Sequence, residues 1–148
     1  MKTPQRILVP SDFSQYANKA VEEALSLAKQ FHAQVYLLHV VGDIQQCAAE
    51  YCLTSEMVDE YRKTSLESSE KKLKEDLAKF PGAKDVQVSV DVRLGAAAEE
   101  ILKEEQEKKI DLIVIATHGK TGFLKQLMGS VADRVSRGAK GRVMLVKA

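Results

Sequence analysis

The sequence predicts an α/β fold, a single open sheet of five mostly parallel strands with helices on both faces. Five short apolar segments alternate with longer segments of helical periodicity along the chain. Several of the apolar segments are nearly continuous aliphatic runs, which is typical of strands that helices cover on both sides. Glycine and proline fall between these segments or at their ends. Strand–helix alternation of this kind favours parallel pairing with right-handed crossovers.

Five strands are expected in chain order. The first is short and apolar, and the second is a nearly continuous apolar run. The third alternates apolar and polar residues, which predicts a sheet edge or a half-covered face. The fourth is fully apolar, and the fifth is an apolar segment that would form a sheet edge open to pairing. Their expected bounds are 6–10, 34–41, 86–92, 111–116 and 142–147.

Four helices are expected between the strands. The first begins at Ser14, a plausible N-cap. The second is long and amphipathic and stops at Pro81, the third follows Gly95, and the fourth is short with Ser130 as its expected cap. Segment 42–53 is expected to be a loop over the end of the second strand. The expected helices are 14–31, 54–80, 96–108 and 130–137.

The composition indicates one cytoplasmic globular domain over residues 1–148. The chain is long enough to bury a core, and its 45% hydrophobic and 29% charged residues are typical of a folded protein. A net charge of +1 gives no electrostatic reason to expect a nucleic-acid partner. No apolar run approaches the roughly 20 residues of a membrane span, and the first residues lack the features of a signal peptide. Neither nucleic acid nor a membrane is therefore expected as a partner.

The two cysteines, Cys47 and Cys52, are close together in the sequence. A structural zinc site needs four ligands, and neither a second cysteine pair nor a nearby histidine completes the set. Two reduced thiols are the favoured interpretation in a cytosolic protein, and a disulfide between them is the alternative. No metal site is predicted.

The segments that follow the strands predict a small-molecule site. In open α/β sheets, ligands bind beyond the carboxyl ends of the strands, where the winding direction reverses. Four segments leave such ends: 11–14, 41–43, 94–95 and the loop from Thr117. Three of them contain glycine and two contain aspartate. Short strand-to-helix turns favour the same residues, so the composition alone leaves both interpretations open.

The loop from Thr117 has the strongest signal for a phosphate site. Gly119, Gly122 and Gly129 follow an apolar strand and lead into the predicted helix at Ser130. Glycine allows close approach of the backbone, and N–H groups at a helix N-terminus attract an anion. A P-loop is excluded because its first glycine would fall at Val114 in mid-strand, and no GxGxxG follows the first strand.

No catalytic machinery is evident. Asp12, His118 and Ser130 suggest a hydrolytic triad, but the GxSxG elbow that would expose a nucleophilic serine is missing. His39 is expected to be a hydrogen-bonded core residue, and His32 to lie at a helix end. Since no residue stands out as a base that activates water, any hydrolysis is expected to be slow.

Over essentially its full length the chain resembles the universal stress proteins of the UspA type. The matching segments are RILVPSDFS (6–14), LLHVV (37–41) and GAAAEEI (95–101). The most specific match is ATHG (116–119), then nine residues, then GSV (129–131). It is similar to the G-x2-G-x9-G-S/T signature of the ATP-binding branch, with Ala116 in place of the first glycine.

This resemblance implies the Rossmann-like sandwich of the adenine nucleotide alpha hydrolases and a bound ATP, with Mg²⁺ held through the phosphates. AMP or a cyclic nucleotide remains an alternative. Asp12 and Val40 would contact the base, Ala116 the ribose, and the backbone from Gly119 and Gly129 onward the phosphates. The implied cofactor-binding residues are Pro10, Ser11, Asp12, Val40, Ala116, His118, Gly119, Gly129, Ser130 and Val131. Lys120 would add positive charge.

The resemblance also implies a homodimer, because in similar proteins the last strand pairs antiparallel with its twin. Val143, Met144 and Leu145 would then be interface residues, whereas the alternative is an edge covered by its own neighbours. The implied function is a nucleotide-dependent stress-response switch with at most slow ATP hydrolysis. A dimeric interaction module that binds no nucleotide is the alternative, because Ala116 departs from the signature. A phosphotransferase or hydrolase would need a second substrate pocket.

Overall fold

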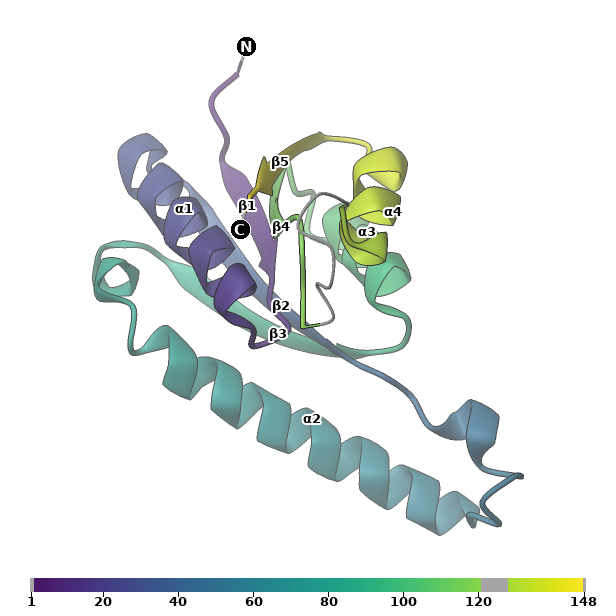
Figure 1. The fold of residues 1–148 in the computed structure, drawn as a ribbon. Coiled ribbons are helices and arrows are strands. Elements are labelled where there is room, and N and C mark those ends of the chain that lie inside the picture. Colours follow the sequence, from purple (N-terminus) through teal and green to yellow (C-terminus); the bar gives the residue numbers. More distant parts are fainter. Residues whose placement is uncertain (1, 121–127, 148) are drawn as a thin grey trace.

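The computed structural model describes residues 2–120 and 128–147 and has a five-stranded sheet between two layers of helices (Figure 1). The strand order is β3-β2-β1-β4-β5, and every pairing is parallel. The strands are β1 (Arg6–Pro10), β2 (Gln34–Val41), β3 (Val88–Leu94), β4 (Leu112–Ala116) and β5 (Arg142–Val146). The helices are α1 (Gln15–Phe31), α2 (Ser55–Leu77), α3 (Ala97–Glu107) and α4 (Ser130–Gly138). The predicted α/β fold is confirmed, and β3 and β5 form the two edges as expected.

The largest differences from the predicted bounds lie between α2 and β3. Proline disfavours helical backbone at the residue before it, and Phe80 has the extended dihedrals φ −86° and ψ 116°. α2 therefore ends at Leu77, three residues before the predicted end. A 3-10 helix, η2 (Pro81–Asp85), follows, so β3 begins at Val88 instead of residue 86.

α1 forms as its sequence predicts. Ser14 is the N-cap, and its hydroxyl accepts a hydrogen bond of 3.1 Å from the backbone N–H of Ala17. The helix ends at His32, a left-handed C-cap whose N–H donates to the carbonyl of Ala28. The residues buried against the sheet recur at helical spacing: Ala17, Ala20, Val21, Ala24, Leu25 and Ala28.

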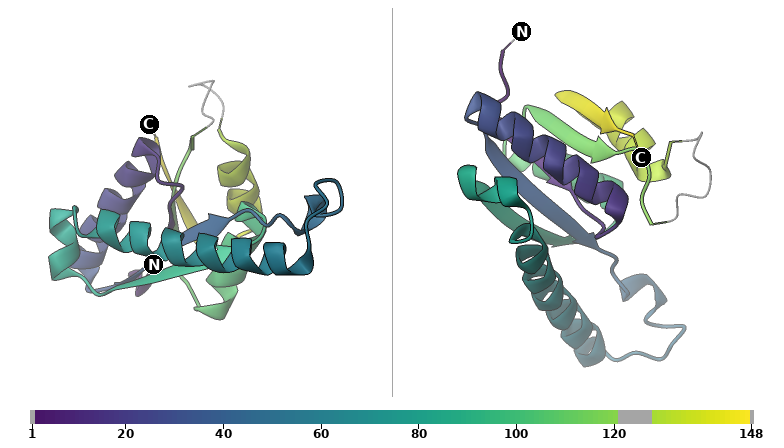
Figure 2. Two further views of the ribbon diagram at one scale, coloured as in Figure 1. Left: turned by 90° about the horizontal axis from the view of Figure 1, so that it is seen from below. Right: turned by 60° about the vertical axis from the view of Figure 1, so that its left-hand side comes forward.

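Two apolar clusters lie on opposite faces of the sheet. Successive side chains of a strand point to opposite faces, so Ile7 and Val9 join one cluster while Leu8 joins the other. α1 and the C-terminal part of α2 cover the first face, and α3 and α4 cover the second (Figure 2). Both faces of the central strands are therefore buried, which explains their continuous apolar sequence.

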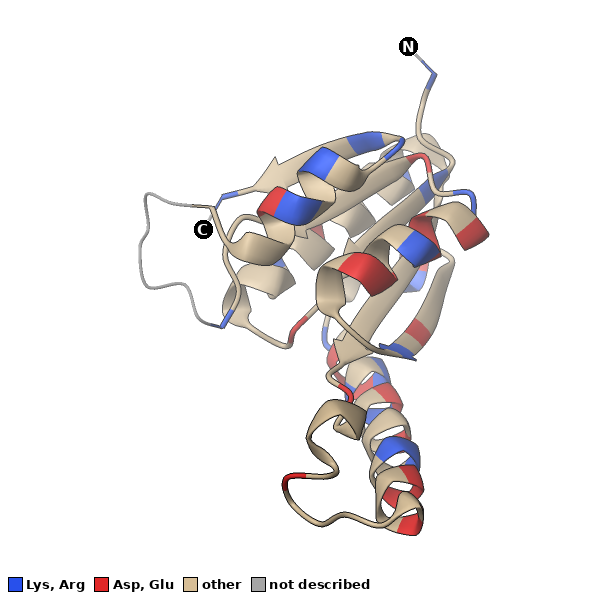
Figure 3. Ribbon diagram, turned by 90° about the vertical axis from the view of Figure 1, so that its right-hand side faces the viewer, with Lys and Arg blue, Asp and Glu red and all other residues tan. Residues whose placement is uncertain are grey.

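α2 extends beyond the sheet together with the preceding loop (Figure 3). Only Val58 and Leu73 are buried along its 23 residues, and charges of both signs line the rest. Segment 42–53, predicted as a loop, contains the 3-10 helix η1 (Gln45–Cys47). Asp43 ties this loop to α2 by an ion pair of 2.8 Å with Arg62.

The same loop carries both cysteines as free thiols, with Cys47 half-buried and Cys52 exposed.

Of the helices that the structure describes, none has the length and apolar character needed to cross a membrane.

Candidate functional site

A pocket of about 250 Å³ lies at the carboxyl ends of β1 and β4, beside the N-terminus of α4. The winding direction of the sheet reverses between these two strands. All ten residues predicted to bind a cofactor line this pocket: Pro10, Ser11, Asp12, Val40, Ala116, His118, Gly119, Gly129, Ser130 and Val131. The fold thus gathers three separate parts of the chain around one cavity. Gly122 lies outside the described residues.

Further lining residues were not predicted for the site. They are Ala17, Leu38, His39, Ala97, Ile101, Ile115, Thr117 and Ala132. Most are apolar strand or helix residues whose periodicity indicates only a core position. The register of β1 and β2, which pairs Pro10 with Leu38, accounts for the approach of β2 to the pocket.

Two of the four segments that were expected to form the site, 41–43 and 94–95, do not line the pocket. Gly95 serves a turn instead: its φ is +144°, and a Cβ there would lie 2.8 Å from the Glu100 side chain. Gly95 is therefore explained by the geometry of this turn, which is the second of the two interpretations given for these segments.

The chain turns sharply after β1 at Phe13, which has a left-handed φ of 66°. This conformation is unusual for an aromatic residue and typically costs about 1–3 kcal/mol. The Phe13 N–H donates to the Ser11 hydroxyl at 3.1 Å, and the ring packs on His39 with centroids 4.3 Å apart. Lys72 Nζ lies 4.2 Å from the ring centroid. These contacts hold a turn that brings Ser11 and Asp12 to the pocket wall.

Asp12 joins the turn after β1 to the glycine loop after β4. Its Oδ1 accepts from the Ser14 N–H at 3.0 Å, and its Oδ2 accepts from the Lys120 N–H at 3.0 Å. Burial raises the pKa of the Asp12 carboxyl, but the hydrogen bonds from Ser14 and Lys120 outweigh burial and leave the pKa below its usual value. Asp12 is therefore an ionised acceptor at neutral pH.

His39 lies at the pocket wall, and its Nδ1 is 2.7 Å from the Ser11 carbonyl oxygen. Because a carbonyl oxygen can only accept, Nδ1 carries the proton. Burial lowers the pKa of His39, and the positive charge of Lys120 adds to this effect against the Ser11 hydrogen bond. The ring is thus neutral at pH 7. The expected hydrogen bond is present, but the ring borders the pocket instead of the core.

Gly119 and Gly129 lie where the chain packs too closely for a side chain. A Cβ on Gly119 would lie 2.5 Å from Asp12 Oδ2, and a Cβ on Gly129 would lie 3.2 Å from the Thr117 carbonyl oxygen. The Gly129 N–H donates to that oxygen at 2.7 Å, which fixes the approach to α4. This close packing therefore explains glycine at both positions, and both residues line the pocket where the signature places the phosphates.

The N-cap of α4 is Gly129, with φ −62° and ψ 153°, so the prediction that Ser130 caps the helix was wrong. Ser130 is the first helical residue, and the cap residue itself, a glycine, has no side chain that could accept from the helix. Without a side-chain oxygen on the cap, the first N–H groups of the helix are left to other acceptors. Their partial positive charge favours an anion at this place.

His118 lies next to these groups. Its Nδ1 is 2.9 Å from the Thr117 hydroxyl oxygen, and its ring centroid is 6.2 Å from that of Tyr16. Thr117 in turn is 91% buried and donates its backbone N–H to Val146 of β5. The glycine loop is thus anchored to the last strand at its beginning.

The arrangement is suited to holding an anion more than to hydrolysing it. Backbone N–H groups and glycines converge on one wall, and apolar residues form the other. Asp12 is a weak base because its pKa is lowered. The donor set fits a phosphorylated ligand with an apolar or aromatic part.

The family model of the universal stress proteins matches residues 3–147 of this chain. The universal stress protein MJ0531 of Methanocaldococcus jannaschii is 34% identical over 143 residues, which cover 97% of this chain and 82% of that protein. The solved structure of MJ0577 from the same organism superimposes with a TM-score of 0.84 at 26% identity, covering 99% and 98% of the two chains.

More distant structures share the fold. A universal stress protein in complex with cAMP has a TM-score of 0.64 at 20% identity and covers 99% of this chain and 98% of its own. A universal stress protein of Archaeoglobus fulgidus in complex with dAMP has a TM-score of 0.59 at 20% identity, covering 99% and 100%. With a family model matched from end to end, this chain belongs to the universal stress protein family.

Proposed function

We propose that this chain is a homodimeric universal stress protein that binds an adenine nucleotide, ATP above all, and acts as a nucleotide-dependent stress-response switch. The observation that carries the proposal is the convergence of all ten residues that the resemblance implies on one pocket at the N-terminus of α4. The cAMP and dAMP complexes support it in one respect, because they show that this fold can hold an adenine nucleotide.

In the proposed pose the base lies beside Asp12 and Val40, and the ribose lies against Ala116. The phosphates lie at Gly119, Gly129 and the first N–H groups of α4, which are the groups suited to an anion. Mg²⁺ is held mainly by phosphate oxygens. Because the pocket of about 250 Å³ is just below the usual range of about 300–1,000 Å³ for small-molecule sites, part of the nucleotide lies at its mouth.

Hydrolysis in this pose is slow, so nucleotide occupancy rather than turnover is the signal. An attacking water needs a base near neutral pKa. Asp12 accepts two backbone hydrogen bonds and has a lowered pKa, which makes it a poor candidate.

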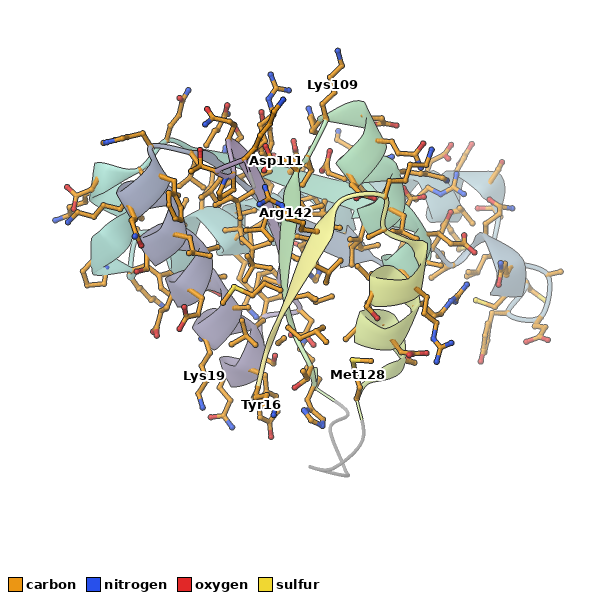
Figure 4. All side chains as sticks on the ribbon, turned by 90° about the horizontal axis from the view of Figure 1, so that it is seen from above. Tyr16, Lys19, Lys109, Asp111, Met128 and Arg142 are labelled. Carbon is orange, nitrogen blue, oxygen red and sulfur yellow. The ribbon has the colours of Figure 1, made fainter. Side chains whose placement is uncertain are left out.

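The proposed dimer forms along β5. Met144 and Leu145 expose 36% and 40% of their surface on this edge strand. In Figure 4 β5 lies in front of β4, between α1 and α4, with Arg142 and Asp111 at one end of the strands and Tyr16 near the other. An exposed apolar edge strand favours pairing with a second strand.

Two substitutions distinguish phosphate binding by the backbone N–H of Ser130 from binding by its hydroxyl. Ser130→Ala removes only the hydroxyl, whereas Ser130→Pro also removes the N–H. Proline is well tolerated at the first helical position, and the extended backbone of Gly129 suits a following proline. Calorimetric titration with Mg-ATP should show affinity reduced about tenfold or more by Ser130→Pro and only a few-fold by Ser130→Ala, about 1.4 kcal/mol being tenfold.

Thermal unfolding of both variants checks that α4 is intact. Equal affinity of wild type and Ser130→Pro, with unchanged unfolding midpoints, would show that the phosphates do not bind at α4.

A second candidate function is a dimeric interaction module that binds no nucleotide. The observation in its favour is Ala116, which lines the pocket where the signature has glycine. Wild-type protein that takes up no adenine nucleotide at millimolar ATP would support this module.

A further inference from the structure

The interface between β3 and α3 is polar, although it lies inside the fold. Alternate residues of β3 pack on the α2 side, namely Val88, Val90 and Val92. Asp91 and Arg93 therefore face α3. α3 places carboxylates opposite them, because Glu100, Glu104 and Glu107 recur at helical spacing and lie on one face of the helix.

Arg93 lies among these carboxylates. Its Nε is 2.9 Å from Glu100 Oε2, and its Nη1 is 2.8 Å from Glu107 Oε2. Glu104 is more distant, with 3.7 Å between Arg93 Nη1 and Glu104 Oε1. The guanidinium is thus well paired by two carboxylates, and the third receives only a weak contact.

Glu104 is the most buried of these groups, with 1% of its surface exposed. Two buried side-chain oxygens have no hydrogen-bond partner within residues 2–120 and 128–147: Glu104 Oε2 and Asp91 Oδ2. Lys108 Nζ lies 3.9 Å from Asp91 Oδ2, which is too far for a hydrogen bond. A buried acceptor without a donor is costly, and a proton between two carboxyl groups satisfies both.

The net charge of the groups around Glu104 and Asp91 also favours one bound proton. Four carboxylates, Asp91, Glu100, Glu104 and Glu107, face three cations, Arg93, Lys103 and Lys108. One proton makes the cluster neutral. From the neighbouring elements, Tyr36 of β2 donates its hydroxyl to Gln34, and Arg134 of α4 lies 3.9 Å from Glu99. These groups are engaged elsewhere and add no counter-charge.

We propose that Glu104 carries a proton, donates it in a hydrogen bond to Asp91, and thereby makes the β3–α3 edge of the fold sensitive to pH. Loss of the proton leaves two carboxylates beside each other, Glu104 buried and Asp91 with 34% of its side chain exposed, and these like charges repel. β3 is an edge strand that packs on β2 and α2, and the ion pairs of Arg93 and Lys108 join it to α3.

Protonation of Glu104 is linked to folding, and this linkage determines whether stability rises or falls with pH. Burial first, and the charge of Asp91 second, raise the pKa of Glu104 from 4.5 to about 7, against the opposing charges of Arg93 and Lys108. A raised pKa in the folded state gives stability that is complete at low pH and is lost as the pH rises through neutral. The free energy of unfolding therefore falls between about pH 4.5 and about pH 7, the pKa values of Glu104 in the unfolded and the folded chain.

Thermal unfolding from pH 5 to pH 8.5 tests this with a neutral isostere. We expect the wild-type midpoint to fall by about 5 °C more than that of Glu104→Gln, whose amide can donate to Asp91 at every pH. At pH 8.5 the variant should be the more stable protein. Glu99→Gln is the matched control, because Glu99 is on the same helix with 61% of its side chain exposed, and it should keep the wild-type slope.

A second measurement uses the wild-type chain and does not depend on the variant folding. Side-chain carboxyl ¹³C shifts should show Glu104 titrating near neutral pH, well above an ordinary glutamate. The proposal is overturned if Glu104 titrates near 4.5, its ordinary value, or if Glu104→Gln keeps the full wild-type pH dependence.

Discussion

At the scale of single residues, the departure at position 116 matters most for the proposed site. The described residues other than glycine with positive φ are Phe13, His32, Cys52 and Lys109. Ala116 is not among them, so its backbone conformation does not require glycine. Its side chain packs with the apolar cluster on the α1 face of the sheet, whereas α4 lies on the other face. A methyl group in that place is compatible with a ligand at α4.

Ala116→Gly should therefore leave nucleotide affinity nearly unchanged. We expect the Kd for Mg-ATP to change by less than about threefold, below 1 kcal/mol. The unfolding midpoint should fall, since glycine in a strand costs about 0.5–1 kcal/mol relative to alanine. Calorimetry and thermal unfolding of the two proteins measure both effects. A gain in affinity of tenfold or more would instead show that the methyl obstructs the ribose and would favour the interaction module.

Single residues also show the limits of sequence reasoning. Ser14 could be identified as a cap because it directly precedes a helical pattern. Ser130 was misplaced by one position, because serine is favoured at a cap and nothing local distinguishes the cap from the first helical residue. The burial of Glu104 could not be predicted, because a glutamate in an amphipathic helix is expected to face solvent.

At the scale of elements, β5 carries the proposed dimer. Leu145→Lys places a charge on the exposed edge, and we expect it to convert a dimer to a monomer in sedimentation velocity experiments. Met57→Lys is the matched control, because Met57 is an exposed apolar residue of α2, far from β5, at 54% exposure. If wild type is monomeric, or if both variants remain dimers, β5 is not the interface.

The elements themselves were largely predictable, because each has a clear periodicity and clear boundary residues. Apolar runs identified β2 and β4, and the alternation of β3 indicated an edge. The order of the strands in the sheet, and the helix that packs on each face of a strand, depend on contacts between distant segments. Local sequence does not contain this information, so the polar β3–α3 interface became visible only in three dimensions.

At the scale of the whole molecule, the candidate site depends on topology. β1 lies in the middle of the sheet, and the chain winds outward from it in both directions, so residues 10–12 meet residues 116–120 and 129–131 at the carboxyl ends of the strands. The glycine signature identified the lining residues between 116 and 131, because such a pattern is local in the sequence, and the resemblance of the first two strands added Pro10, Ser11, Asp12 and Val40. The apolar lining residues Leu38 and Ile101 were missed, because packing against a ligand and packing against a core leave the same pattern.

The central claim is that this pocket holds an adenine nucleotide. The most direct measurement is to denature freshly purified protein, identify any released nucleotide by chromatography and mass spectrometry, and titrate emptied protein with Mg-ATP. We expect either a roughly stoichiometric adenine nucleotide or saturable binding of the added one. Protein that releases none and binds none at millimolar Mg-ATP would contradict the account, and the glycines at 119 and 129 would then serve the turns alone.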